Sequence, residues 1–121
     1  MPAVPVVAIT NRFSLEPPPA EQAERLKAAL LEAVSPQGEL IVDASGMAHI
    51  FSFEVAVLVQ VTEALRKRGG QLALCGVGEK LLLVIEMLGL TEVLALYADV
   101  EACLAATGWT RGETAPLDLQ S

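Results

Sequence analysis

Two kinds of hydrophobic pattern alternate along the chain. Short runs of β-branched and aliphatic residues are typical of buried strands, whereas apolar residues that recur every three or four positions are typical of a helix with one apolar face. The helical spacing is clearest at Ala23, Leu26, Leu30 and Ala33. The elements predicted in chain order are strand 4–9, helix 20–34, strand 40–42, helix 53–68, strand 71–75, helix 79–88, strand 93–97 and helix 99–106.

The segment 53–68 fits both patterns. Apolar residues alternate from Phe53 to Val61 as in a strand, but a strand of this length would be unusual. The basic run Arg66-Lys67-Arg68 and the pair Gly69-Gly70 suit the C-terminal end of a helix. We therefore predict a helix with more apolar circumference than one sheet face can bury, so that part of it contacts another subunit or a partner.

The alternation of strands and helices favours right-handed crossovers and a largely parallel sheet. We expect an α/β domain over residues 1–106 with a small, mixed but mostly parallel sheet of about four strands and about four helices. Pro5 suggests that the first strand lies at an edge, because proline has no amide hydrogen to donate. Residues 107–121 are expected to form a C-terminal tail, partly docked through Trp109.

Composition and charge argue against several classes of protein, among them nucleic-acid-binding and membrane-spanning proteins. Hydrophobic residues make up 53% of the 121 residues, which is ample for a single core. The net charge of −7 argues against a nucleic-acid partner. The chain has no apolar stretch long enough to cross a bilayer, and residues 1–10 lack a secretory signal, so we expect a cytoplasmic protein. Cys75 and Cys103 lie in apolar segments and are expected to be reduced core thiols.

The order of several motifs resembles that of the STAS domain family. The segment LIVDASGMAHIFSFEVAVL, residues 40–58, is similar to the family signature, in which a buried strand and a turn lead to a phosphorylatable serine that opens a helix. Ser52 falls on that serine. The pair Gly69-Gly70, the strand QLALC at 71–75 and the segment MLGLTEVL at 87–94 follow in the family's order. The resemblance is best over residues 39–106.

Two positions depart from the family pattern. The family has an additional first strand and a Gly-Glu-Leu-Asp turn before the first helix, whereas this chain has Asn11-Arg12-Phe13-Ser14 at the matching positions and lacks that strand. At the phosphorylation motif, the family's Asp-Ser-Ser-Gly is replaced by Phe51-Ser52-Phe53-Glu54. Only one of the two hydroxyl groups remains.

The resemblance implies a regulatory function without catalysis. The type of protein that it implies is an anti-sigma factor antagonist, a bacterial signalling protein that regulates transcription. Such a protein docks on an anti-sigma factor with serine kinase activity and is released when its serine is phosphorylated. The implied protein is no enzyme and needs no cofactor. The alternative is a constitutive structural STAS subunit, in a homodimer, a stress-signalling scaffold or a transporter-associated complex, without phosphorylation.

The residues around Ser52 have two interpretations each. Ser52 is a phosphorylation candidate, because a helix N-terminus favours anions, but it is also a suitable helix cap, with Phe51 packed on Ala56. Phe51 and Phe53 suit either an interface or the core. Glu54 in the first turn stabilises the helix dipole or mimics a permanent charge. The predicted partner-binding residues are Phe51, Ser52, Phe53, Glu54 and Val57.

Other chemistry finds little support in the sequence. His49 is the only histidine and has no nearby cysteine or carboxylate spacing, so it is interpreted as a turn residue rather than as a metal ligand or general base. Gly76 to Lys80 is rich in glycine but has the spacing of neither a P-loop nor a dinucleotide fingerprint. We therefore predict no catalytic residues and no metal site.

Overall fold

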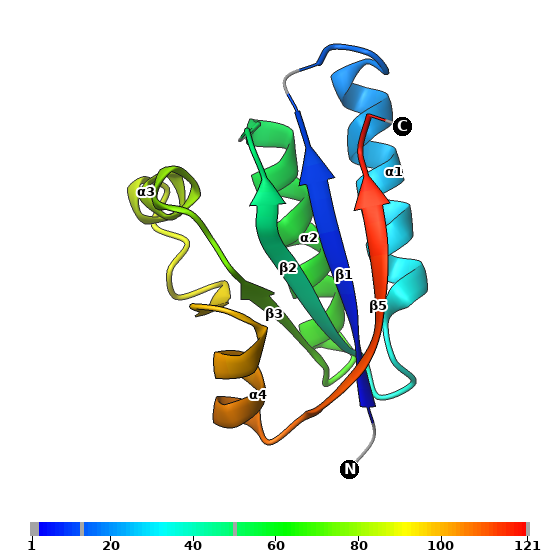
Figure 1. The fold of residues 1–121 in the computed structure, drawn as a ribbon, viewed down its shortest axis with the longest axis vertical. Coiled ribbons are helices and arrows are strands. Elements are labelled where there is room, and N and C mark those ends of the chain that lie inside the picture. Colours follow the sequence, from blue (N-terminus) through cyan, green and yellow to red (C-terminus); the bar gives the residue numbers. More distant parts are fainter. Residues whose placement is uncertain (1–2, 13, 50, 121) are drawn as a thin grey trace.

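A computed structural model describes residues 3–12, 14–49 and 51–120 as four helices and five strands (Figure 1). Phe13, which belongs to the segment matched to the family's first turn, lies outside the described residues. The elements are β1 (Ala3–Asn11), α1 (Pro19–Ala33), β2 (Glu39–Met47), α2 (Ser52–Lys67), β3 (Gln71–Cys75), α3 (Glu79–Met87), β4 (Ala95–Tyr97), α4 (Val100–Thr107) and β5 (Thr110–Asp118).

The five strands form one sheet in the order β4-β3-β2-β1-β5, and every neighbouring pair is parallel. The prediction of an α/β fold with a largely parallel sheet is confirmed. Figure 1 shows α1 and α2 behind the sheet. They cover the main core, and α4 covers a smaller apolar cluster that includes Val4, Val6 and Ile41.

The C-terminal segment is a strand, and the prediction of a tail was wrong. β5 pairs with β1 from Thr110 to Asp118, and Leu119 beyond it is fully buried. The segment gives a weak strand pattern because β5 is an edge strand with both faces largely exposed, where glycine, proline and charged residues are tolerated. Backbone pairing with β1 orders this segment, because its own side chains bury little surface.

The position of β1 is a second correction. β1 lies between β2 and β5, not at the edge that Pro5 suggested. The register between β1 and β5 shifts between Val4 and Val6, so Pro5 sits at an irregularity of the ladder. A Cβ atom on Gly112 would lie 2.7 Å from the Val4 carbonyl oxygen. Glycine at this position lets β5 approach β1 closely enough to pass the proline.

Two predicted strands have different lengths in the structure. β2 continues through Asp43 to Met47, because Asp43 pairs with Cys75 on one side and Gly46 pairs with Thr10 on the other. β4 begins only at Ala95. The longer β2 carries the loop that precedes α2 out to the carboxyl end of the sheet.

α2 is more deeply buried than its pattern suggested. Its apolar side chains at Val55, Leu58, Val61 and Leu65 are at most 3% exposed. α1 packs along α2, so the sheet and α1 together cover the apolar sides of α2. We had expected one of these sides to contact a partner. None of the exposed large hydrophobic residues in the described part of the chain lies on α2.

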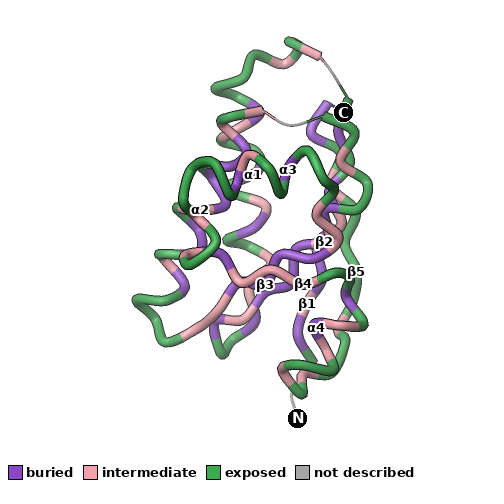
Figure 2. Tube along the Cα trace, turned by 90° about the vertical axis from the view of Figure 1, so that its left-hand side faces the viewer, coloured by how far each residue is buried: buried purple, intermediate pink, exposed green. Residues whose placement is uncertain are grey.

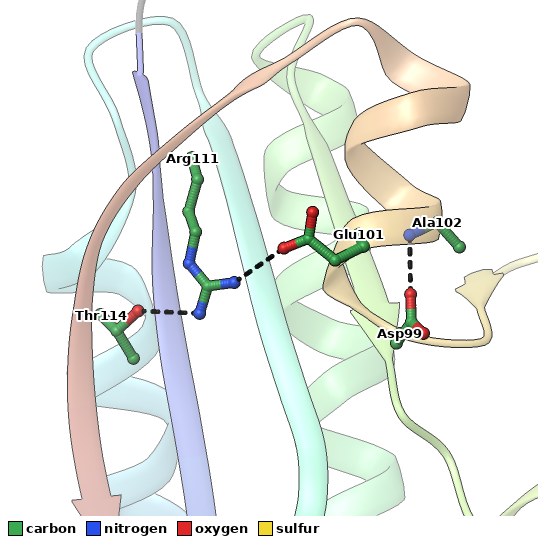
Figure 3. Close-up of polar contacts among 5 residues, drawn as sticks. All are labelled: Asp99, Glu101, Ala102, Arg111 and Thr114. Carbon is green, nitrogen blue, oxygen red and sulfur yellow. Dashed lines mark hydrogen bonds and ion pairs between the residues drawn. The ribbon is translucent and has the colours of Figure 1, made fainter.

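α4 is fixed by polar contacts at its N-terminal end. The Asp99 side chain accepts a hydrogen bond of 2.7 Å from the Ala102 amide, which confirms its prediction as the N-cap (Figure 3). Arg111 of β5 lies 3.4 Å from Glu101. Cys75 at the end of β3 and Cys103 on the buried side of α4 are free and belong to the same apolar cluster, as predicted, and half-buried Trp109 packs against it.

Candidate functional site

The predicted site lies at the carboxyl end of the parallel sheet. β2 ends at Met47, and a short loop leads to Ser52, the first residue of α2. β3 lies beside β2 and leads in the same direction into α3 (Figure 1). Because all strands are parallel, their following loops gather at one end of the molecule, which is where open α/β sheets place ligands.

Ser52 is exposed, and its interpretation as a helix cap was wrong. The N-cap of α2 is Phe51, in an extended conformation, and the Ser52 side chain makes no capping hydrogen bond there. Ser52 instead occupies the first helical position, where backbone amides have no partner within the helix. Its hydroxyl group is therefore accessible at the positive end of the helix dipole.

Phe51 and Phe53 flank Ser52 and contact each other. Their ring centroids lie 5.4 Å apart with an angle of 25° between the ring planes, so the rings are stacked. Both residues are half-buried, which places them neither in the core nor freely in solvent. Ala56, the expected partner of Phe51, is exposed. The stacked pair is an aromatic surface beside the serine hydroxyl group.

Glu54 lies inside the protein. Its side chain is 1% exposed, and its two carboxylate oxygens accept hydrogen bonds from the Phe51 amide at 2.8 Å and from the Asn11 side-chain amide at 2.6 Å. The first of these bonds is one half of a capping box. Burial raises the pKa of Glu54, while the two hydrogen bonds oppose that shift.

Asn11 holds the loop that leads to the site. Its Oδ1 atom accepts hydrogen bonds from the amides of Ala48 and His49 at 2.8 and 3.1 Å, and its Nδ2 atom donates to the His49 carbonyl oxygen at 2.8 Å. Together with its bond to Glu54, these contacts tie the end of β1 to the loop and to the first turn of α2. The role of Asn11 was not predicted, because this residue was interpreted only as part of the turn before the first helix; the available signal was a polar side chain at the end of an apolar strand.

Two of the predicted contact residues cannot touch a partner directly. Glu54 and Val57 are 1% and 4% exposed, so both belong to the interior in this structure. Their prediction as partner-binding residues is corrected to a supporting role, because they position the exposed turn from beneath. Phe51, Ser52 and Phe53 remain the surface candidates.

A hollow of about 370 Å³ lies beside this turn. It separates the end of β2 from the first turn of α3, and it is open to solvent. Its lining residues are Ala44, Met47, Ala48, Gly78, Glu79, Lys80 and Leu81. Most of these groups are small or apolar, so the hollow suits a protein side chain better than a charged small molecule.

Within the described ranges, no three histidine, cysteine or carboxylate side chains are grouped as metal ligands would be. His49 is exposed in the loop before α2, at the turn position that we predicted. In the same ranges, no helix is long and apolar enough to span a membrane. The chemistry that this end of the sheet offers is an exposed serine whose two neighbours in sequence form a stacked aromatic pair.

Comparison with known proteins supports the resemblance stated above. The model of the STAS domain family matches residues 20–103. A crystal structure of a proposed anti-sigma factor antagonist from Thermotoga maritima has a TM-score of 0.69 and 18% identity, over 85% of this chain and 87% of that chain. No curated protein sequence matches.

Two further structures share the fold. A STAS domain protein from Planctomyces limnophilus, described as an anti-sigma factor antagonist, has a TM-score of 0.62 and 21% identity, over 81% of this chain and 80% of that chain. The STAS domain of a SulP transporter from Vibrio cholerae also has a TM-score of 0.62, with 15% identity over 88% of this chain and 82% of that chain. At these identities the similarity concerns the fold.

Proposed function

Because this chain belongs to the STAS domain family, we propose that it is a regulatory protein that binds another protein through the first turn of α2, and that phosphorylation of Ser52 releases the partner. The partner class that the resemblance suggests is an anti-sigma factor with serine kinase activity. In this proposal Phe51 and Phe53 make the apolar contact, and the Ser52 hydroxyl group is the acceptor of the phosphate.

The observation that carries this proposal is the exposure of Ser52 at the start of α2. A kinase needs access to a hydroxyl group, and the first helical position provides it. The stacked rings of Phe51 and Phe53 beside it are half-buried aromatic groups, which commonly anchor interfaces. A phosphate at this place would add up to about two negative charges within the contact surface.

Asn11 and Glu54 support the proposal because they fix the conformation of the backbone around Ser52. The four hydrogen bonds of Asn11 and the bond from the Phe51 amide to Glu54 fix the backbone on both sides of the turn. A partner would therefore meet a preformed surface and lose little entropy in ordering it. A fixed turn also means that the phosphate acts by charge and volume, not by refolding the loop.

The experiment compares wild-type protein with Ser52→Ala and Ser52→Asp in pull-downs from the cytosol of the source organism, with mass spectrometry of the bound proteins and of Ser52. Thr91→Asp, on the exposed turn before β4, adds the same charge elsewhere and serves as the control. We expect phosphate on Ser52 and loss of one partner with Ser52→Asp alone. An unmodified Ser52 and identical partners for all four proteins would refute the switch.

A second candidate function is a constitutive structural subunit. The observation that favours it is the sequence of the turn, because Phe51 and Phe53 stand where the family's motif has aspartate and a second serine. A stacked aromatic pair suits a permanent contact, in a homodimer, a scaffold or a transporter-associated complex. This candidate predicts the opposite result in the same experiment: binding that all Ser52 variants retain.

A further inference from the structure

Most of the exposed large hydrophobic side chains in the described part of the chain lie on α3 or at its end. Of the six large hydrophobic side chains that are exposed, four belong to α3 or its C-cap residue: Leu82, Leu83, Met87 and Leu88, at 36%, 57%, 77% and 60% exposure. We term the neighbouring pair Leu83 and Met87 the α3 apolar face. A cluster of this kind on a soluble domain marks an interaction surface more often than chance exposure does. Nothing in the proposed contact at Ser52 accounts for it.

The α3 apolar face belongs to a firmly anchored helix. Leu81 and Ile85, on the opposite side of α3, are 3% and 0% exposed and belong to the main core. Figure 2 shows the rest of α3 as largely exposed. Leu83 and Met87 lie one helical turn apart and so form a continuous ridge. The unbranched Met87 side chain can adapt to the shape of a contacting surface.

The charges beside this ridge indicate the chemistry of its occupant. Glu79 and Glu86 are exposed and lie two turns apart on one side of α3, next to Leu83. Lys80 is the only basic residue of the helix, and the whole chain carries a net charge of −7. A complementary surface therefore combines apolar side chains with lysine or arginine at its border.

A second copy of the chain does not meet this requirement. A second copy offers only one basic residue on α3, Lys80, against the two carboxylates Glu79 and Glu86. Each copy also carries a net charge of −7, so two copies repel each other. The edge strand on this side, β4, has only three residues and offers little for an added strand.

We propose that the α3 apolar face binds an amphipathic helix of a protein partner, one whose apolar ridge packs between Leu83 and Met87 and whose flanks carry lysine or arginine. A helical ridge packs into the grooves of another helix. The hollow lined by Met47, Ala48 and the first turn of α3 places this helix beside the loop before Ser52. The inference rests on the proposed function, because it describes the chemistry of the partner that the same end of the molecule would bind.

The test uses a synthetic amphipathic peptide with leucines on one face and lysines on its flanks, titrated into isotope-labelled protein and followed by NMR. We expect the largest shifts at the amides of α3. The double variant Leu83→Asp/Met87→Asp should raise the dissociation constant at least tenfold. The double variant is more acidic than the wild type. If the basic peptide bound by charge attraction alone, the variant would therefore have a lower dissociation constant.

Three controls make the result specific. Leu15→Asp adds a charge at a leucine that is 62% exposed outside α3 and should leave binding unchanged. A peptide with glutamates in place of the lysines should bind more weakly. Circular dichroism verifies folding, and Met87→Asp alone, at the most exposed position, replaces the double variant if that one unfolds.

Equal dissociation constants for wild type and variants, or shifts confined to other elements, would overturn the proposal. So would a dimer in sedimentation that the double variant dissociates, because the face would then belong to a second copy. The peptide titration requires neither a phosphate nor Ser52. Its failure would therefore leave the Ser52 switch standing, and failure of the switch would leave the α3 contact standing.

Discussion

At the scale of single residues, the buried pair of Asn11 and Glu54 explains why the turn before α2 has a fixed shape. Both carboxylate oxygens of Glu54 face hydrogen-bond donors, the Phe51 amide and the Asn11 side-chain amide. Only a carboxylate offers two acceptors in this geometry, since glutamine would turn one donor group toward another. The pairing joins positions 43 residues apart in sequence, which explains why no local pattern predicts it.

Glu54→Gln should destabilise the fold by about 1–3 kcal/mol, because one buried donor loses its acceptor. Urea unfolding monitored by circular dichroism measures the difference. Glu63→Gln, at an exposed position of the same helix, is the matched control and should stay within about 0.5 kcal/mol of the wild type. Equal losses of unfolding free energy in both variants would show that the buried hydrogen bonds of Glu54 do not contribute to stability.

The two cysteines give a prediction for alkaline pH. Burial raises the pKa of Cys75 from 9.0 to about 12 and also raises the pKa of Cys103. A raised pKa in the folded state means that the full contribution to stability is present below pH 9.0 and is lost as the pH rises toward about 12, because the unfolded thiol ionises first. The difference in unfolding free energy between wild type and Cys75→Ala should therefore shrink over that range.

Chemical labelling gives a direct measurement of the same burial. With iodoacetamide at pH 8, both thiols of the folded protein should react at least about a hundredfold more slowly than those of the urea-unfolded chain, because only an accessible thiolate is nucleophilic. Rapid labelling of the folded protein would contradict the burial of Cys75 and Cys103 in the apolar cluster between the sheet and α4.

At the scale of elements, the fold could be predicted where side-chain patterns match their surroundings. Helix α1 and strand β3 have clear patterns, and their predicted bounds differ from the observed ones by at most a residue at either end. β5 could not be predicted, because it owes its order to backbone pairing with β1 and its side chains are mostly exposed. The wide apolar pattern of α2 was also misleading, since α1 packs along it and buries the surplus.

Leu119→Ala tests whether the C-terminal segment is part of the core. Leu119 is 0% exposed, so its truncation should cost about 2–5 kcal/mol in the free energy of unfolding. Leu15→Ala, at a leucine that is 62% exposed, provides the comparison and should change that free energy by less than about 0.5 kcal/mol. A docked tail without a structural role would give the same small change at both positions.

At the scale of the whole molecule, the parallel sheet gathers the candidate contacts at one end. Ser52 follows β2 and the α3 apolar face follows β3, so two neighbouring strands bring both to the carboxyl edge. The resemblance to the STAS family located Ser52 and its aromatic neighbours from sequence. The α3 apolar face could not be predicted from the helix expected over residues 79–88, because only the packing shows which of its sides the core leaves uncovered.

The measurement that tests the central claim most directly is the affinity of the captured partner for this protein before and after stoichiometric phosphorylation of Ser52, determined by isothermal titration calorimetry. We predict at least a tenfold higher dissociation constant for the phosphorylated form, equivalent to about 1.4 kcal/mol. Ser52→Ala treated with the same kinase should keep the original affinity. Equal affinities of the two forms of the wild-type protein would contradict the account and leave a constitutive subunit in its place.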